Sequence, residues 1–258
     1  MNYIRRGSGP PLLLLHGLGG SIRTWDTIAD ALATERELVI VELPGFGATP
    51  PLPTVTMAAL ADAVTAFLAE HGLTGIDAVG SSMGARLALE LARRGVVGNV
   101  VSLDPGGFWQ GWEVGVFGRS VAISLKLVRA LQPMMPLLTG NPVLRSVLFA
   151  QFSAHPWTIP ADAALTEMRS FAHAPSFEPL LDQLVKGPPQ EGSATTPGRI
   201  VIGWGRRDLV CFPTQAERAL RAFPNAQLHW FDNCGHFPHW DSPAETVRLI
   251  LDNTALVA

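Results

Sequence analysis

Short apolar runs alternate with segments of helical periodicity over the first hundred residues. The runs are "PLLLLHG", "ELVIVELPG", "GIDAVGS" and "GNVVSLDPGG", and between them lie "TWDTIADALA", "TMAALADAVTAFLAEHG" and "MGARLALELARRG". Continuous apolar strands separated by helices are typical of a parallel sheet that is buried on both faces. The pattern therefore predicts an α/β fold with a mostly parallel sheet flanked by helices.

This alternation stops after Pro105 and resumes near residue 197. Residues 108–196 contain no convincing buried strand, and prolines interrupt their helical segments. The strand "GRIVIGWG" then begins a final unit with the helix "FPTQAERALRAFP", the strand "AQLHWFD" and the closing helix "SPAETVRLILDN". We expect a core made of residues 1–107 and 197–258, interrupted by a helical insertion at 108–196.

The composition fits one large domain with such an insertion. The chain has 258 residues, of which 47% are hydrophobic and 16% charged, so it can bury a sizeable core. A net charge of -3 and the lack of a basic run argue against a nucleic-acid partner. We expect a small-molecule substrate, and the sequence leaves the oligomeric state open, a homodimer included.

The cysteines and the N-terminal segment bear on the compartment. Cys211 and Cys234 form no CxxC motif and no disulfide framework, so we interpret both as free, buried thiols. The run "PPLLLLHGLGG" lacks a cleavage site and is too short for a membrane span. These features predict a cytoplasmic protein that is not associated with a membrane.

The segment "VGSSMGARLA" carries the most informative motif. Gly80-Ser81-Ser82-Met83-Gly84 fits G-x-S-x-G between a predicted strand and a predicted helix. A nucleophile at such a sharp turn needs small residues two positions before and after it, because the chain passes close to itself. Ser82 is then the candidate nucleophile. Ser81 is one position out of register and is interpreted as a small turn residue.

A serine nucleophile requires a base and an acid that orients the base. "GWGRRDLVCFP" places Asp208 just after a predicted strand, and "FDNCGHFPHW" places His236 just after the next one. The carboxyl ends of parallel strands share one edge of a sheet, so the three side chains can converge there. Their order along the chain is serine, aspartate, histidine, as in α/β-hydrolases.

Taken together, five segments resemble the α/β-hydrolase superfamily over nearly the whole chain. "LLLLHGLGGSIRTW" is similar to its HG loop, "ELPGFGATP" to its D-x-P-G-x-G segment, and "GSSMGARLALELA" to its nucleophile elbow. "GWGRRDLVCFP" and "CGHFPHWDSP" resemble its acid and histidine loops. The resemblance implies an α/β-hydrolase fold, with residues 108–196 as the cap that shapes the pocket and a reduced antiparallel pair of strands at the start.

The resemblance also implies the roles of individual residues. Ser82 would be the nucleophile, His236 the base and Asp208 the orienting acid, while the backbone amides of Leu18 and Met83 would form the oxyanion hole. No cofactor or metal ion is expected.

Further residues near these motifs are candidates for substrate binding or support. His16, Gly17, Arg86 and Trp109 are candidate substrate-binding residues. His16 is also expected to hold its loop by hydrogen bonds, and for Arg86 a structural salt bridge is the alternative. For three further residues we expect supporting roles: Glu42 as a loop anchor where the family often has Asp, Asp104 as a less favoured alternative to Asp208, and His239 as a surface or capping residue.

These inferences predict a serine hydrolase of the carboxylesterase type. Its substrate would be a small to medium, partly apolar carboxylic ester or related acyl compound, cleaved through an acyl-enzyme. Two alternatives use the same triad, a carbon–carbon bond hydrolase and a pyruvate-eliminating lyase. The first typically has Asn before the serine and Trp after the histidine, where this chain has Ser81 and Phe237; the second shares an arginine like Arg86. A ligand-binding receptor that retains the triad is the alternative from a different class.

Overall fold

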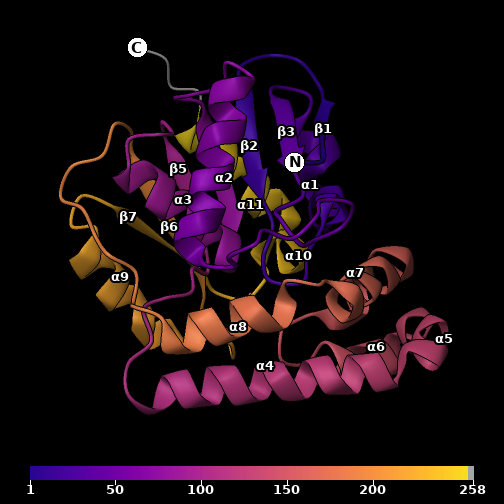
Figure 1. The fold of residues 1–258 in the computed structure, drawn as a ribbon. Helices are drawn as coiled ribbons and strands as arrows, with labels where there is room; N and C mark the ends of the chain where they lie inside the picture. Colours follow the sequence, from indigo (N-terminus) through magenta and orange to yellow (C-terminus); the bar gives the residue numbers. More distant parts are fainter. Residues whose placement is uncertain (255–258) are drawn as a thin grey trace.

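The computed structural model describes residues 1–254 and contains a seven-stranded sheet (Figure 1). The strand order is β1-β3-β2-β4-β5-β6-β7, and β1 alone pairs in the antiparallel direction. The strands are β1 (Tyr3–Arg6), β2 (Pro11–Leu15), β3 (Glu37–Val41), β4 (Asp77–Ser81), β5 (Val100–Leu103), β6 (Ile200–Gly205) and β7 (Gln227–Phe231). The predicted α/β class with a mostly parallel sheet is therefore confirmed.

Helices cover both faces of this sheet because its central strands are apolar on both sides. In β2, Leu12 and Leu14 face one core cluster, whereas Leu13 and Leu15 face the other. The first cluster packs under α1 (Asp26–Leu32) and α11 (Pro243–Asn253), and the second under α2 (Met57–Glu70), α3 (Met83–Arg93) and α9 (Ala216–Ala222). Successive side chains of a strand point to opposite faces of the sheet, so the apolar strands form one apolar layer on each face.

The chain between β5 and β6 forms helices and, within the described residues, no strand. These inserted helices are α4 (Trp112–Ala130), α5 (Met135–Gly140), α6 (Pro142–Leu148), α7 (Ala161–His173) and α8 (Phe177–Lys186), with short 3-10 turns at Gln132–Met134 and Pro156–Thr158. In Figure 1 they lie together below the sheet. The limits of the cap at 107/108 and 196/197 stay a prediction.

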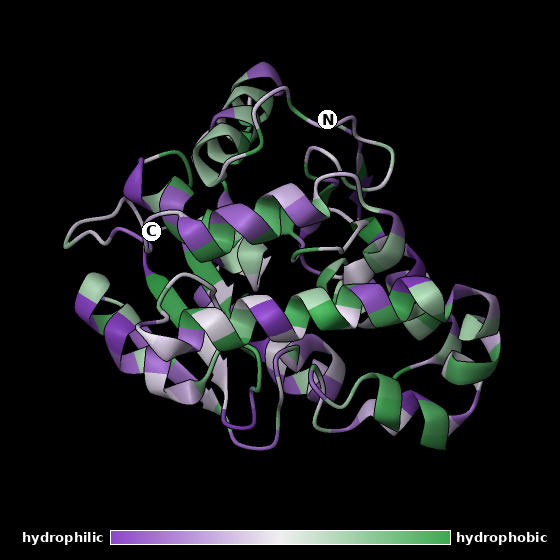
Figure 2. Ribbon diagram, turned by 60° about the horizontal axis from the view of Figure 1, so that its bottom comes forward, coloured by the Kyte–Doolittle hydropathy of each residue, from purple (hydrophilic) through white to green (hydrophobic). Residues whose placement is uncertain are grey.

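The inserted helices expose several large apolar side chains. Figure 2 turns their side of the molecule forward and shows hydrophobic residues among hydrophilic ones along them. Trp112 is 70% exposed and Ile123 65% exposed, both on α4.

Across residues 1–254, none of the helices combines the length and the hydropathy that crossing a membrane would require.

Candidate active site

Ser82 lies in a strained turn between β4 and α3. It directly follows β4, and its backbone angles are φ 56° and ψ -114°, a region that non-glycine residues rarely adopt. A Cβ on Gly80 would overlap the carbonyl oxygen of Gly84, and a Cβ on Gly84 would overlap that of Leu15. The glycine spacing in the sequence is therefore required by close backbone contacts on both sides of the serine.

This packing predicts a loss of stability when Gly84 is changed to Ala. The new methyl group would meet backbone of β2 rather than a movable side chain, so α3 has to shift. We expect the free energy of unfolding to fall by about 1–3 kcal/mol and Tm to fall by roughly 2–12 °C. Thermal unfolding followed by circular dichroism measures this change. Gly140→Ala is the matched control, because nothing lies within 4 Å of a Cβ at that position; equal Tm values for the two variants would contradict the prediction.

His236 connects Ser82 to Asp208 by two hydrogen bonds. Its Nε2 lies 2.8 Å from Ser82 Oγ, and its Nδ1 lies 2.8 Å from Asp208 Oδ2. A carboxylate only accepts hydrogen bonds, so the ring proton belongs on Nδ1. The unprotonated Nε2 then accepts the hydrogen bond that the Ser82 hydroxyl donates, which is the arrangement that proton removal from the serine requires.

Backbone groups hold both the acid and the histidine in place. The amides of Val210 and Cys211 donate to Asp208 Oδ1 at 2.7 and 3.0 Å. The amide of His236 donates to the carbonyl oxygen of Phe152 at 2.9 Å, which connects the histidine loop to the inserted helices. Asp208 and His236 are 1% exposed, so water does not compete for these bonds.

Asp104 lies beside Asp208 but is not hydrogen-bonded to His236. It follows β5 with φ 48°, and its Oδ1 accepts a hydrogen bond from the amide of Gly205 at 2.8 Å. Burial, and next the charge of Asp208, raise the pKa of Asp104 well above its usual range. The geometry therefore selects Asp208, rather than Asp104, as the partner of the histidine.

The two expected oxyanion donors lie at the same cavity as Ser82. Leu18 and Met83 both line it. Met83 is the first residue of α3, where a backbone N–H has no acceptor within the helix. Such an amide is available for an oxygen that becomes negative next to Ser82.

His16 positions the loop that contains Leu18. The amide of Leu43 donates to His16 Nε2 at 3.1 Å, so the ring proton lies on Nδ1 and is donated to the carbonyl oxygen of Gly17 at 2.8 Å. Burial lowers the pKa of His16 to about 4, so the ring is neutral at pH 7. Glu42, the expected loop anchor, accepts hydrogen bonds from the side chain of Asn2 and the amide of Ala48, both at 2.7 Å.

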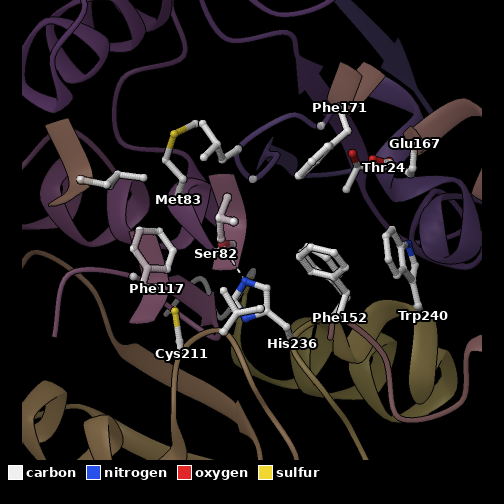
Figure 3. A pocket seen from close by; sticks show the side chains of 18 of the residues that line it. Thr24, Ser82, Met83, Phe117, Phe152, Glu167, Phe171, Cys211, His236 and Trp240 are labelled. Carbon is white, nitrogen blue, oxygen red and sulfur yellow. Dashed lines mark hydrogen bonds between the residues drawn. The ribbon is translucent and has the colours of Figure 1, made fainter. Parts of the chain in front are cut away.

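A mostly apolar cavity opens at Ser82 and His236 (Figure 3). It contains about 740 Å³ of space free of protein atoms, part of which is open to solvent. Among the described residues that line it, Glu167 carries the one carboxyl group. The apolar and aromatic lining includes Leu18, Met83, Trp109, Phe117, Val121, Phe152, Met168, Phe171, Leu184, Val210, Phe237 and Trp240. Two of the candidate substrate-binding residues, Gly17 and Trp109, thus lie at the cavity.

The other two candidates are placed elsewhere. His16 is not among the lining residues, and neither is Arg86. The Arg86 guanidinium donates to the carbonyl oxygen of Pro188 at 2.8 Å and to the side chain of Gln190 at 3.3 Å. A Cβ on Gly107 would lie 3.0 Å from the Arg86 side chain. Arg86 therefore holds the connection that returns from α8 to the sheet. Neither of these partners could be predicted from the sequence pattern.

The expectation that His239 is a surface residue is wrong. It lies in the short helix α10 (Pro238–Asp241) and is 0% exposed. This turn points the ring inward, where its centroid lies 5.2 Å from that of Trp25. Within residues 1–254 neither ring nitrogen has a hydrogen-bond partner, and burial lowers the pKa of His239 to about 3. His239 is a neutral core residue whose ring packs against Phe237, one of the residues that line the cavity.

Sequence reasoning missed three residues at or near the site. Asp241 accepts hydrogen bonds from the amides of Gly235, at 2.7 Å, and of Ala154, at 2.8 Å, and so ties the histidine loop to the inserted helices. Cys211 and Glu167 line the cavity. A signal for Glu167 was present, because it is a lone acid on the apolar stripe of its helix; nothing in the sequence pattern singled out Asp241.

One group of side chains in the described part of the chain has the composition of a metal site. Potential ligand atoms of Asp208, Cys211 and His236 lie within 4.8 Å of one another. Burial raises the pKa of the Cys211 thiol well above its usual range, which opposes the thiolate that binds metals. Both nitrogens of His236 are also engaged in hydrogen bonds. The donor set is therefore suited to acid–base chemistry rather than to a metal ion.

Cys211 and Cys234 are free and buried, as expected.

The sequence of this chain is similar to those of known hydrolases and related proteins. A model described as "Alpha/beta hydrolase family" matches residues 12–249. The dihydrolipoyllysine-residue acetyltransferase component of the acetoin cleaving system of Cupriavidus necator is 28% identical over 249 residues; the match covers 92% of this chain but only 61% of that protein. The mouse sn-1-specific diacylglycerol lipase ABHD11 is 27% identical, with 92% and 78% covered.

Two further matches complete the comparison. A 2-hydroxy-6-oxononadienedioate/2-hydroxy-6-oxononatrienedioate hydrolase of Dechloromonas aromatica is 25% identical over 267 residues, with 98% of this chain and 89% of that protein covered. Among solved structures, a thermophilic esterase from Thermogutta terrifontis superposes with a TM-score of 0.74 at 20% identity, covering 97% of this chain and 91% of the esterase. At that identity the likeness concerns the fold alone.

Proposed function

The chain belongs to the alpha/beta hydrolase family, and from that premise we propose that it is a serine hydrolase that cleaves carboxylic esters or related acyl compounds. The observation that carries the proposal is the hydrogen-bonded series Ser82–His236–Asp208. Ser82 and His236 of this series line a mostly apolar cavity. Its substrate is of small to medium size and partly apolar, because the cavity offers mainly aliphatic and aromatic contacts.

The chemistry proceeds in two halves. Ser82 Oγ attacks the carbonyl carbon while its proton passes to His236 Nε2, and Asp208 stabilises the resulting imidazolium. The carbonyl oxygen becomes negative and accepts hydrogen bonds from the amides of Leu18 and Met83. The tetrahedral intermediate collapses, His236 gives its proton to the leaving alcohol oxygen, and an acyl-enzyme remains. Water then loses a proton to His236 as its oxygen attacks the acyl carbon, and Ser82 regains a proton when the acid departs.

A second candidate is carbon–carbon bond hydrolysis by the same three residues. The match to the Dechloromonas aromatica hydrolase over nearly the whole of this chain favours it. Ser81 and Phe237 stand where that subgroup typically has Asn and Trp, so ester hydrolysis remains the first proposal. The lyase alternative loses its main support, because Arg86 is not among the residues lining the cavity.

Ester hydrolysis is tested with p-nitrophenyl esters of increasing acyl length, from acetate to decanoate. We expect a burst of p-nitrophenol that equals the enzyme concentration, followed by slower steady turnover, with an optimum at short or medium chains because the cavity contains only about 740 Å³ of free space. Stopped-flow absorbance measures both phases. No release of p-nitrophenol from folded protein would contradict the proposal. Stoichiometric release followed by long retention of the acyl group would instead indicate the receptor alternative.

The cytoplasmic location and the independence from cofactors stay predictions, and the oligomeric state stays open, a homodimer included.

A further inference from the structure

One carboxyl group lies in the otherwise apolar cavity. Glu167 belongs to the stripe of α7 that also buries Ala164, Met168 and Phe171. Its side chain lines the cavity and the residue is 7% exposed. Within the described chain, Oε1 has no hydrogen-bond partner. A buried carboxyl oxygen without a partner costs free energy, so it persists where something outside the chain can satisfy it.

The neighbours of Glu167 do not account for it as a structural group. No ion pair within residues 1–254 includes it. Burial, with a smaller contribution from the charge of Asp26, raises the pKa of Glu167 to about 7, and a hydrogen bond from the Thr24 side chain opposes the rise. Near neutral pH the carboxyl can therefore either donate or accept a hydrogen bond. The described neighbours supply Thr24 as a partner and no cation.

The position of Glu167 gives the cavity two unlike sides. In Figure 3, Met83, Phe117 and Cys211 lie on one side of the Ser82–His236 pair. Thr24, Glu167 and Trp240 lie on the other side. A substrate whose carbonyl carbon is at Ser82 extends one portion toward each side. The first side offers apolar contacts, and the second combines apolar contacts with an unsatisfied carboxyl oxygen.

We propose that Glu167 determines specificity by binding a hydrogen-bond donor, a hydroxyl or an ammonium group, on the substrate portion remote from the scissile carbonyl. This inference rests on the proposed ester hydrolysis for its reaction but not for its binding chemistry. A substrate donor would satisfy Oε1, and the apolar surroundings would exclude water from that bond. A substrate that ends in a methyl group would leave the carboxyl unsatisfied.

Pairs of esters that differ in one terminal group test this proposal. The p-nitrophenyl ester of ω-hydroxyhexanoic acid is compared with that of heptanoic acid, and ω-hydroxybutyl hexanoate with pentyl hexanoate, so that the hydroxyl lies on the acyl or on the alcohol portion. We expect the ratio of kcat/KM within one pair to fall by roughly 10- to 100-fold in Glu167→Met relative to the wild type. Asp162→Asn, an exposed carboxyl on the same helix, should leave both ratios unchanged.

Two further variants separate the donor types and a structural role. Glu167→Gln keeps a hydrogen-bonding group without charge, so it should keep the preference for the hydroxyl ester and lose any preference for an ω-amino ester. Since an unsatisfied carboxyl is removed, Glu167→Met should have a Tm equal to or above that of the wild type. A lower Tm with unchanged substrate ratios would show a structural role and overturn the proposal.

A binding measurement separates this proposal from ester hydrolysis itself. Calorimetry with the Ser82→Ala protein compares methyl ω-hydroxyhexanoate with methyl heptanoate, and ω-hydroxybutyl hexanoate with pentyl hexanoate, with and without Glu167→Met. Tighter binding of the hydroxy ester that depends on Glu167 supports the subsite even if the wild type hydrolyses no ester. Ester turnover with equal ratios in the wild type and Glu167→Met overturns the subsite and leaves the hydrolase proposal intact. Equal affinities within both pairs likewise overturn the subsite.

Discussion

Changing Ser82 to Ala is expected to lower kcat for every ester that the wild type hydrolyses by roughly 10⁴- to 10⁶-fold and to abolish the burst. The variant lacks the oxygen that forms the acyl-enzyme, and no other hydroxyl is hydrogen-bonded to His236 among the described residues. The amides of Leu18 and Met83 remain, so a low residual rate above that of water is expected from transition-state binding alone. Stopped-flow absorbance with p-nitrophenyl esters measures both the burst and the steady rate.

The neighbouring serine provides the matched control. Ser81 is 0% exposed, and its hydroxyl has no hydrogen-bond partner in the described structure. Removing that hydroxyl in Ser81→Ala therefore breaks no hydrogen bond, and activity should stay close to that of the wild type. Near-native activity of Ser82→Ala on all substrates, or a loss of equal size in Ser81→Ala, would contradict the assignment of the nucleophile.

Changing Asp208 to Asn is expected to lower kcat by about 10⁴-fold. The amide can donate to His236 Nδ1, which favours the ring tautomer with its proton on Nε2, and that tautomer cannot accept the Ser82 proton. The variant also loses the negative charge that stabilises the imidazolium. Steady-state kinetics with the best ester of the panel measures the effect, and circular dichroism verifies that the variant is folded.

Asp104→Asn is the comparison that separates the two acids. The amide can still accept the hydrogen bond from Gly205, and His236 is not bonded to this side chain, so kcat should change by less than about 10-fold. A loss in Asp104→Asn that matches or exceeds the loss in Asp208→Asn would reverse the assignment of the orienting acid.

The same variant has an expected effect on stability that depends on pH. The pKa of Asp104 is raised in the folded protein, so the folded state keeps a proton that the unfolded state loses above about pH 4. The wild type is thus penalised as pH rises from about 4 toward neutrality, and Asp104→Asn is not. The Tm of the variant should exceed that of the wild type at pH 7, and the difference should shrink as pH falls toward 4. A constant difference across this range would contradict the raised pKa.

The sequence determined the architecture and the order of the chemical groups. Continuous apolar runs such as "PLLLLHG" identify strands that are buried on both faces, because a polar residue there would lose its hydration. The glycines around Ser82 likewise predict a tight strand-to-helix turn, and Asp208 and His236 follow strands whose ends share one edge of the sheet. These features depend on local periodicity and on the topology of parallel sheets, both of which are readable along a chain.

Only the tertiary structure decided what lies around those groups. Asp104 and Asp208 each come after a strand of the same sheet, and the choice between them depended on which carboxylate reaches His236. His239 was expected at the surface and proved to be buried, because a single turn of α10 sets the direction of its ring. Glu167 is distant in sequence from every motif of the site and joins the cavity through the packing of α7 over the core. Such contacts between side chains far apart along the chain depend on how whole helices are placed, and no local pattern encodes that placement.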